Sequence, residues 1–305
     1  MSTTAFGGDE GSPSRAASPG TAPPRRWTDL RKRVLSALVL GPAALACIWF
    51  GAALWTVLVA AAAAVLAWEW VHLCGLSTRA APGIAVPAAV LAAGALAVAG
   101  WPLAGLALLV AGFGLTWIGA ARLGAAGRLP ARDGVAVPAG ALAAGVLYIG
   151  LAGLALITLR DDNDAGRANV LFLFLVVWAS DIGAYVTGRA LGGPKLAPAV
   201  SPNKTWSGAA GGLAAAVLVG TAAAAVLAPG GEAWRSMAVA AFLGVMAQAG
   251  DLLESWIKRR FRVKDASRLI PGHGGLLDRL DGVLAAAPAA ALLAWILGAG
   301  TPLWQ

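Results

Sequence analysis

Apolar residues occur along most of this chain in runs long enough to cross a lipid bilayer, which requires roughly 17–25 residues. Short polar stretches divide them into nine runs, at residues about 34–50, 52–74, 83–100, 103–121, 135–159, 169–189, 207–228, 234–257 and 282–299. The pattern predicts an all-α integral membrane protein with about nine transmembrane helices. Only "GWP" separates 83–100 from 103–121, so a re-entrant pair is the alternative to two spans there.

Composition agrees with the hydrophobic pattern. Apolar residues make up 59% of the 305 residues and charged residues 12%, whereas soluble domains carry about 25% charged residues. Residues 1–26 are rich in Ser, Pro, Gly and Ala and have no periodic apolar face. They are predicted to be a disordered tail, which leaves residues 27–305 as one polytopic membrane domain.

The positive charges predict the orientation in the membrane. With a cytoplasmic N-terminus, 20 of the 23 Lys and Arg residues fall in the inside segments or at the adjoining helix end at Arg189. The inside segments are 1–33, 75–82, 122–134, 190–206 and 258–281. Cytoplasmic loops carry such an excess, so we expect a multi-pass protein of the cell membrane with its C-terminus outside. The net charge of +8 is then explained by topology, and nucleic acid is not expected as a partner.

Two inside segments combine this positive charge with other reactive groups: Ser180–Gly208 and Gln248–Gly282. In the second, helical spacing places Asp251, Glu254 and Lys258 on one face. An ionisable group at membrane depth costs at least ~2.5–3.5 kcal/mol unless it is paired or hydrated. A Glu254–Lys258 ion pair is one explanation for Glu254, whereas Asp251 has no Lys or Arg at i±3 or i±4.

Further carboxylates follow at Asp278 and Asp281, spaced i, i+3 at the start of the last apolar run. Several carboxylates brought together repel one another, and a divalent cation relieves that repulsion. Asp oxygens are the hard ligands that Mg²⁺ prefers. The alternative is that these aspartates pair with neighbouring cations, namely Arg279, Arg268 or Lys264.

The glycine turn "PGHGG" (residues 271–275) lies just before this helix. Backbone N–H groups of such a turn and a helix N-terminus favour an anion, above all phosphate. In the first segment, "SPNKT" offers further donors from Ser201, Asn203, Lys204 and Thr205, and Asp181 adds a carboxylate within an apolar helix. Metal-binding acids beside phosphate-binding donors predict phosphoryl or nucleotidyl transfer onto a lipid.

Two rival functions remain. Another membrane lipid phosphotransferase, of the CDP-alcohol type, would need DG-x₂-AR, and neither "DGVA" at Asp133 nor "DGVL" at Asp281 is followed by Ala-Arg. A polytopic transporter would place its charges near the bilayer midplane, whereas these charges gather at one face. Elsewhere, Glu69 and His72 lie i, i+3 at the end of the second apolar run. They are expected to form a local polar pair, with contact to substrate as the alternative.

The second segment resembles the phosphatidate cytidylyltransferases (CDP-diacylglycerol synthases). Their signature is matched at every constrained position over residues 255–281, "SWIKRRFRVKDASRLIPGHGGLLDRLD". The matching positions are Ser255, Ile257, Lys258, Arg259, Lys264, Asp265, Ser267, Ile270, Pro271, His273, Gly274, Gly275, Leu276, Asp278, Arg279, Leu280 and Asp281. The upstream "SDIGAY" and "SPNKTWSG" also look like this family, so the resemblance spans about 180–282, the expected catalytic part.

The resemblance implies transfer of a cytidylyl group from CTP to phosphatidate in the cytoplasmic leaflet, giving CDP-diacylglycerol and pyrophosphate. It implies Mg²⁺, with K⁺ as the second ion of a paired cation centre, and a homodimer. Asp251 and Asp278 would hold the cations, with Asp281 close by and Asp181 as a further arm. The remaining catalytic residues would be Lys264, Asp265 and Arg279. The substrate-binding residues would be Ser201, Asn203, Lys204, Thr205, Lys258, Arg259, Arg268, His273, Gly274 and Gly275.

One position departs from the family pattern. The family usually has Glu between the Trp and the Gly of its "KTWEG" element, and this chain has Ser207 there. The resemblance therefore implies no acidic role at this position. Either a neighbouring carboxylate such as Asp181 compensates, or the Glu is dispensable.

Overall fold

The structure is a computed structural model that describes residues 41–127, 131–132, 135–136, 138–160, 164–267, 269, 274–298 and 300–305. The helices are a short one at Gly41–Phe50, then α2 (Ala52–Leu73), α3 (Ala85–Val98), α4 (Pro102–Ala125), α5 (Ala139–Leu159), α6 (Asp164–Leu191), α7 (Trp206–Leu227), α8 (Ala233–Arg260) and α9 (Leu277–Leu297). The predicted tail at 1–26 lies outside the described residues.

Every predicted apolar run corresponds to a helix, but the helices differ in length. Seven of those in the described part are long and apolar enough to cross a membrane, whereas Ala85–Val98 is shorter. Of the first run only Gly41–Phe50 is described, because residues 34–40 lie outside the described residues. At 1.5 Å per residue, the 14 residues of α3 span about 21 Å, less than the roughly 30 Å of a bilayer core. The structure therefore confirms a multi-pass helical protein but not the count of nine spans.

α3 forms an antiparallel hairpin with α4. A Cβ added at Gly105 would lie 2.7 Å from the Ala93 carbonyl oxygen, and one at Gly112 would lie 2.9 Å from the Ala89 side chain. Contacts that move down α3 as they move up α4 are those of two helices running in opposite directions. The segment predicted either as two spans or as a re-entrant pair thus folds as a helical hairpin with one short arm.

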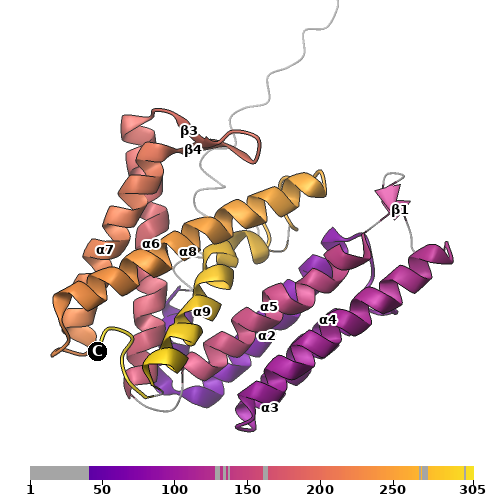
Figure 1. Cartoon of the computed structure of the whole chain (residues 1–305), viewed down its shortest axis with the longest axis horizontal. Helices are drawn as coiled ribbons and strands as arrows, with labels where there is room; N and C mark the ends of the chain where they lie inside the picture. The colour runs from indigo at the N-terminus through magenta and orange to yellow at the C-terminus, as the bar shows by residue number, and fades with distance from the viewer. Residues whose placement is uncertain are drawn as a thin grey trace, which may run out of the picture.

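The buried apolar residues form two hydrophobic cores, and α2, α5, α8 and α9 contribute to both. One core lies around α6 and contains Phe172, which stacks on Trp304 with ring centroids 4.6 Å apart. The other surrounds α2 and α5 and contains Trp70 and Val146. Val283 of α9 faces the first core and Leu284 faces the second. Figure 1 shows α9 between α8 and the α2–α5 side, so its first turn lies where both halves of the protein meet.

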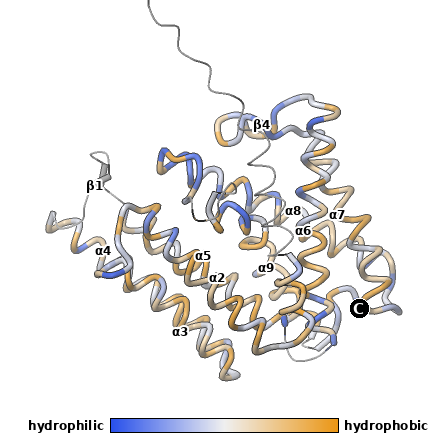
Figure 2. The backbone as a smooth tube through the Cα atoms, turned by 180° about the vertical axis from the view of Figure 1, so that it is seen from behind, coloured by the Kyte–Doolittle hydropathy of each residue, from blue (hydrophilic) through white to orange (hydrophobic). Residues whose placement is uncertain are grey.

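Two β-hairpins were not part of the all-α prediction. Strands β1 (Ala131–Arg132) and β2 (Val135–Ala136) form one, and β3 (Lys195–Ala197) and β4 (Ser201–Thr205) form the other. In the second, Lys195 is in register with Thr205 and Ala197 with Ser201. Figure 2 shows hydrophobic residues along the helices and hydrophilic residues near β4. The predicted polar loop at 190–206 is therefore an ordered hairpin that stands over the ends of α6 and α7.

Small residues allow the closest helix contact, between α6 and α7. A Cβ at Gly183 would lie 2.5 Å from the Ala215 side chain and 2.8 Å from the Gly211 carbonyl oxygen. This agrees with the expectation that Ala- and Gly-rich runs pack closely. The contact brings the ends of both helices together beneath the β3–β4 hairpin.

A leucine at Gly183 should separate α6 from α7. Because the overpacking must be relieved by backbone shifts, we expect the free energy of unfolding to fall by about 1–3 kcal/mol, measured by thermal unfolding of the detergent-purified protein. Gly114→Leu is the matched control, since nothing lies within 4 Å of an added Cβ at Gly114. Equal unfolding midpoints for the two variants would contradict this packing.

Candidate active site

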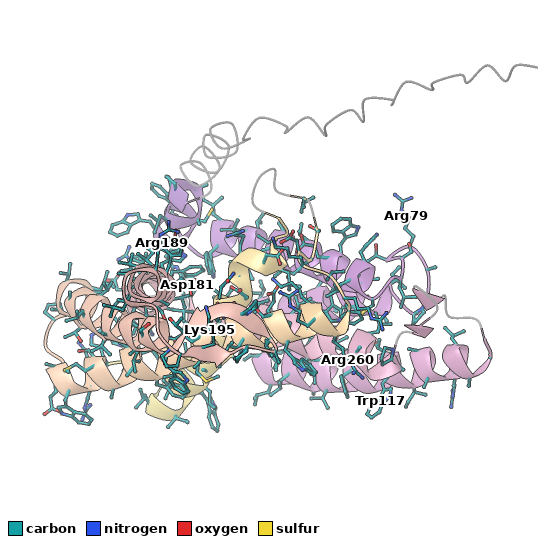
Figure 3. The ribbon with its side chains drawn as sticks, turned by 90° about the horizontal axis from the view of Figure 1, so that it is seen from above. Arg79, Trp117, Asp181, Arg189, Lys195 and Arg260 are labelled. Carbon is teal, nitrogen blue, oxygen red and sulfur yellow. The ribbon has the colours of Figure 1, made fainter. Side chains whose placement is uncertain are left out.

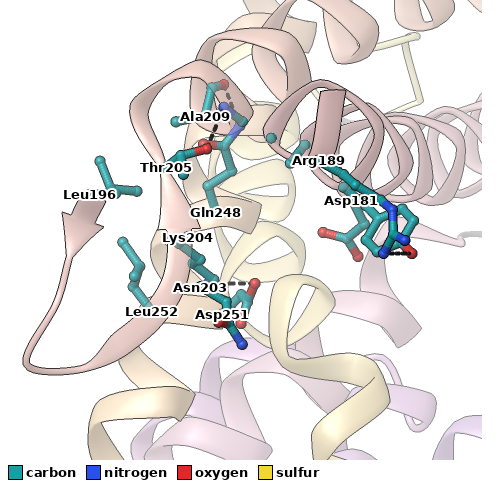
Figure 4. A pocket seen from close by; sticks show the side chains of 14 residues that line it. Asp181, Arg189, Leu196, Asn203, Lys204, Thr205, Ala209, Gln248, Asp251 and Leu252 are labelled. Carbon is teal, nitrogen blue, oxygen red and sulfur yellow. Dashed lines mark hydrogen bonds and ion pairs between the residues drawn. The ribbon is translucent and has the colours of Figure 1, made fainter. Parts of the chain in front are cut away.

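A cavity of about 580 Å³ opens beneath the β3–β4 hairpin. Its walls come from α6, the hairpin, the first turn of α7 and the middle of α8. Its polar side chains include Asp181 and Arg189 from α6, Asn203 and Lys204 from β4, and Asp251 from α8, as Figure 4 shows. Figure 3 shows Asp181, Arg189 and Lys195 on the same side of the molecule, away from Arg79 and Trp117. The cavity thus combines residues from both predicted polar segments.

Lys204 and Asp251 meet in this cavity. The Lys204 ammonium lies 2.5 Å from Asp251 Oδ2, and the two side chains remain 25% and 33% exposed. The cavity therefore contains a paired cation and anion that stay accessible to a ligand.

Gln248, three residues before Asp251, fixes the floor of the cavity. Its amide donates to Ser180 Oγ at 3.2 Å and to the Ala209 carbonyl at 3.1 Å. These bonds tie α8 to α6 and α7, so the position of Asp251 is set by three helices. Gln248 was not among the predicted site residues, because a lone glutamine in an apolar run carries no sequence signal.

α8 and α9 run antiparallel, and this decides which aspartates are neighbours. A Cβ at Gly250 would lie 2.5 Å from the Asp281 carbonyl oxygen, while Lys258 contacts Asp278. Asp281 therefore lies opposite Asp251, and it interacts electrostatically with Asp251 and Asp181. Asp278 lies one turn earlier on α9 and contacts Lys258, which is two turns beyond Asp251 on α8.

A second charged centre surrounds Lys258. Its ammonium lies 2.6 Å from Glu254 Oε2 and 2.8 Å from Asp278 Oδ1. The Glu254 and Asp278 side chains are 1% and 6% exposed. The structure confirms the Glu254–Lys258 pair weighed from the sequence. It also makes Lys258 an internal counterion, so a substrate-binding role for Lys258 stays a prediction.

The start of α9 is bound by two carboxylates of the protein itself. Asp278 Oδ2 accepts from the backbone N–H of Gly275 at 2.9 Å and of Ala266 at 3.0 Å. Glu69 on α2 accepts from the N–H groups of Leu276 at 2.9 Å and Leu277 at 2.7 Å. These donors were expected to face phosphate. Gly275 was predicted to bind substrate, but its backbone N–H already donates to Asp278.

Glu69 was assigned the wrong partner from the sequence. It does not form a local pair with His72, whose Nδ1 lies 2.8 Å from the Trp68 carbonyl oxygen. Instead Glu69 is fully buried and also accepts from Ser267 Oγ at 2.5 Å. Its partners lie 198 to 208 residues away, too far for any local pattern to indicate them.

The hydroxyl groups near β4 fix the start of α7. Thr205 Oγ1 accepts from the Gly208 N–H at 3.1 Å and so caps the helix. Ser207, where the family usually has Glu, donates to the Gly192 carbonyl and lies 3.0 Å from Thr205 Oγ1. Ser207 therefore holds the turn before β3 and offers no charge to the cavity.

The other predicted residues lie in three places. Asn203 lines the cavity, while Ser201 begins β4 and Arg259 Nε donates to the Val200 carbonyl at 3.3 Å. Lys264, Asp265 and Arg279 are exposed, and Gly274 has a positive φ of 85°. Arg268 and His273 lie outside the described residues.

The described acids do not form a ready metal site. Within the described part of the chain, no group of three or more His, Cys, Asp or Glu is arranged to hold a metal ion. The Asp278 oxygens already accept from Lys258, Ala266 and Gly275. Asp281 Oδ1 accepts from the Gly282 N–H at 2.8 Å, and the carboxylate interacts electrostatically with Asp251. The metal-binding roles of Asp181, Asp251, Asp278 and Asp281 stay predictions.

Comparison with known proteins places this site in a family. A model of the cytidylyltransferase family matches residues 31–297, most of the chain. The chain belongs to the cytidylyltransferase family. It is 58% identical over 146 residues to a protein of Brucella suis named phosphatidate cytidylyltransferase, covering 48% of this chain and 53% of that protein.

Similar matches occur in other bacteria. The chain is 39% identical over 143 residues to a phosphatidate cytidylyltransferase of Staphylococcus saprophyticus, covering 47% of this chain and 55% of the relative. The corresponding protein of Staphylococcus haemolyticus is 41% identical over 143 residues, covering 47% and 54%. The matched region therefore spans about half the length of these relatives.

Replacing Lys258 with methionine should leave two buried carboxylates without their cation. Removing one partner of a buried ion pair costs about 3–5 kcal/mol, so we expect a marked fall in the unfolding midpoint of the purified protein. Lys195→Met is the control, because Lys195 is exposed. A Lys258→Met variant as stable as Lys195→Met would mean that Glu254 and Asp278 are neutralised in another way.

Proposed function

We propose that this protein transfers the cytidylyl group of CTP to phosphatidate, giving CDP-diacylglycerol and pyrophosphate. The observation that carries the proposal is the junction of the cavity with the signature segment. Asp251 lines the cavity, Asp281 of α9 interacts electrostatically with Asp251, Asp181 and Lys204 of that cavity, and the exposed Lys264 and Arg279 belong to the adjoining signature. Membership of the family and the names of the relatives support the same reaction.

The reaction needs no covalent intermediate on the protein. A phosphate oxygen of phosphatidate attacks the α-phosphorus of CTP in line, and the bond from that phosphorus to the bridging oxygen of pyrophosphate breaks. Two negatively charged reactants must approach each other, so fixed positive groups stabilise the transition state. Lys204 and Arg189 are cations that line the cavity, and Lys264 and Arg279 would neutralise the departing pyrophosphate.

The donor set suits Mg²⁺, with K⁺ as the expected second ion. Asp251 and Asp281 offer hard carboxylate oxygens that repel each other across the α8–α9 contact, and such oxygens are the preferred ligands of Mg²⁺. These two would hold the ion, with Asp181 across the cavity. Asp278 would join them by giving up its contact with Lys258. A bound divalent ion would supply Lewis-acid neutralisation of the phosphate oxygens.

The orientation of the chain follows from the same proposal. The cavity would face the cytoplasm, where CTP is found, with phosphatidate held in the cytoplasmic leaflet. Arg167 and Arg235, two of the three basic residues expected outside, lie at the opposite end. Arg167 pairs with Asp164 at the start of α6, and Arg235 donates to the Gln305 carbonyl at the C-terminus. A cytoplasmic N-terminus, an outside C-terminus and a homodimer complete the proposal.

The purified protein should convert CTP and phosphatidate into CDP-diacylglycerol with release of pyrophosphate, and chelation of Mg²⁺ should abolish turnover. Asp251→Asn should lower kcat by about a hundredfold or more, because several kcal/mol of charge stabilisation are lost. The measurement is product formation from labelled CTP in detergent–lipid micelles.

The matched control is Asp164→Asn, since Asp164 is a highly exposed aspartate at the other end of α6. It should retain full activity. If the wild-type protein released no pyrophosphate and instead moved a solute across vesicle membranes, the transporter alternative would replace the proposed function.

A further inference from the structure

Glu69 is a buried carboxylate whose partners belong to the signature segment. It lies in the last turn of α2, its exposure is 0%, and no ion pair of the described residues includes it. Its donors are neutral: the Ser267 hydroxyl and the backbone N–H groups of Leu276 and Leu277. A buried carboxylate is costly to keep, so its location calls for an explanation.

α9 cannot cap its own start. Leu276 holds the N-cap position and makes no side-chain cap hydrogen bond, and the first N–H groups of a helix need an acceptor. Glu69 supplies that acceptor from another helix, and its negative charge suits the positive end of the helix dipole. A Cβ at Gly275 would lie 2.8 Å from Glu69 Oε1, so only glycine allows this approach.

Two carboxylates together hold both ends of one segment. Glu69 binds Ser267 at one end and Leu276 at the other, while Asp278 binds the adjacent Ala266 and Gly275. Ala266, Ser267 and Gly275 are thereby held against the first turn of α9. That turn also carries Asp281, which faces Asp251.

We infer that Glu69 is a positioning residue for the transfer reaction: it holds Ser267 of the signature segment against the first turn of α9 and so sets the direction of Asp278 and Asp281. The inference rests on the proposed function. Glu69 acts through other groups, because its buried oxygens are already occupied by three donors. Through Glu69, α2 becomes part of the active centre.

The test compares wild-type protein with Glu69→Gln in detergent–lipid micelles. The amide would place an N–H₂ group against one of the backbone donors, which loosens the clamp. Hydrogen exchange should become faster in peptides that contain Ala266 or Leu276, with no change in α4. Because the aspartates would be held less firmly, the Mg²⁺ concentration for half-maximal activity should rise about 10–100-fold.

The Mg²⁺ midpoint separates positioning from a loss of folded protein, which would lower the maximal rate without moving the midpoint. His72→Gln is the matched control, because His72 is an exposed residue in the same turn of α2; it should change neither measurement. Unchanged exchange in Glu69→Gln overturns the clamp. Faster exchange with an unchanged Mg²⁺ midpoint overturns the positioning role.

Ser267→Ala serves if Glu69→Gln does not fold. It removes one of the three donors, and we expect the same two changes at a smaller size; their absence would overturn the inference. If wild-type protein forms no CDP-diacylglycerol, the proposed function fails and the role in that reaction fails with it. The exchange measurement would still decide whether Glu69 clamps the loop.

Discussion

The charged end of the helical bundle depends on Lys258, whose one ammonium contacts two buried carboxylates. Glu254 lies on the same helix and Asp278 on the next. In surroundings of low dielectric constant, keeping either carboxylate ionised without that cation would cost a large free energy. Lys258 therefore joins α8 to α9 at the same end of the bundle as the signature segment, and Gly250 allows the two helices to touch further along.

The signature segment serves the fold as much as the substrate. Lys258, Ser267, Gly275 and Asp278 all have partners inside the protein. A motif of this kind can be specific because it specifies a loop with many internal hydrogen bonds, not because every residue contacts a ligand. Other members of the segment are exposed, among them Lys264 and Asp265.

Local patterns predicted what is local in this structure. Apolar runs predicted the helices, and the i, i+4 spacing of Glu254 and Lys258 anticipated their ion pair. Span number was less predictable, because a run such as 83–100 contains a helix of only 14 residues. The β3–β4 hairpin was missed because its proline-rich sequence has no strand periodicity.

Contacts between distant segments could not be predicted in the same way. Glu69 carried a polar signal, but its donors lie across the whole chain, and a helix gives no sign of which partner its last turn will meet. Grouping Asp251 with Asp278 followed from their places in the motif. The antiparallel contact of α8 with α9 was needed to reveal that Asp281 is the nearer neighbour of Asp251.

α8 connects the two charged centres and explains why they are separate. Gln248 and Asp251 face the cavity, and Glu254 and Lys258, one and two turns later, face α9. The part of α8 with Gln248 and Asp251 lies at the cavity, next to Lys204 of β4. The part with Glu254 and Lys258 packs against α9. A ligand that reaches the partly exposed Asp251 competes with one lysine contact, whereas one that recruits the buried Asp278 must displace Lys258, which also pairs with Glu254. The cost of that displacement makes the Asp251–Asp281 pair the favoured place for a cation to enter, with Asp278 holding the loop beside it.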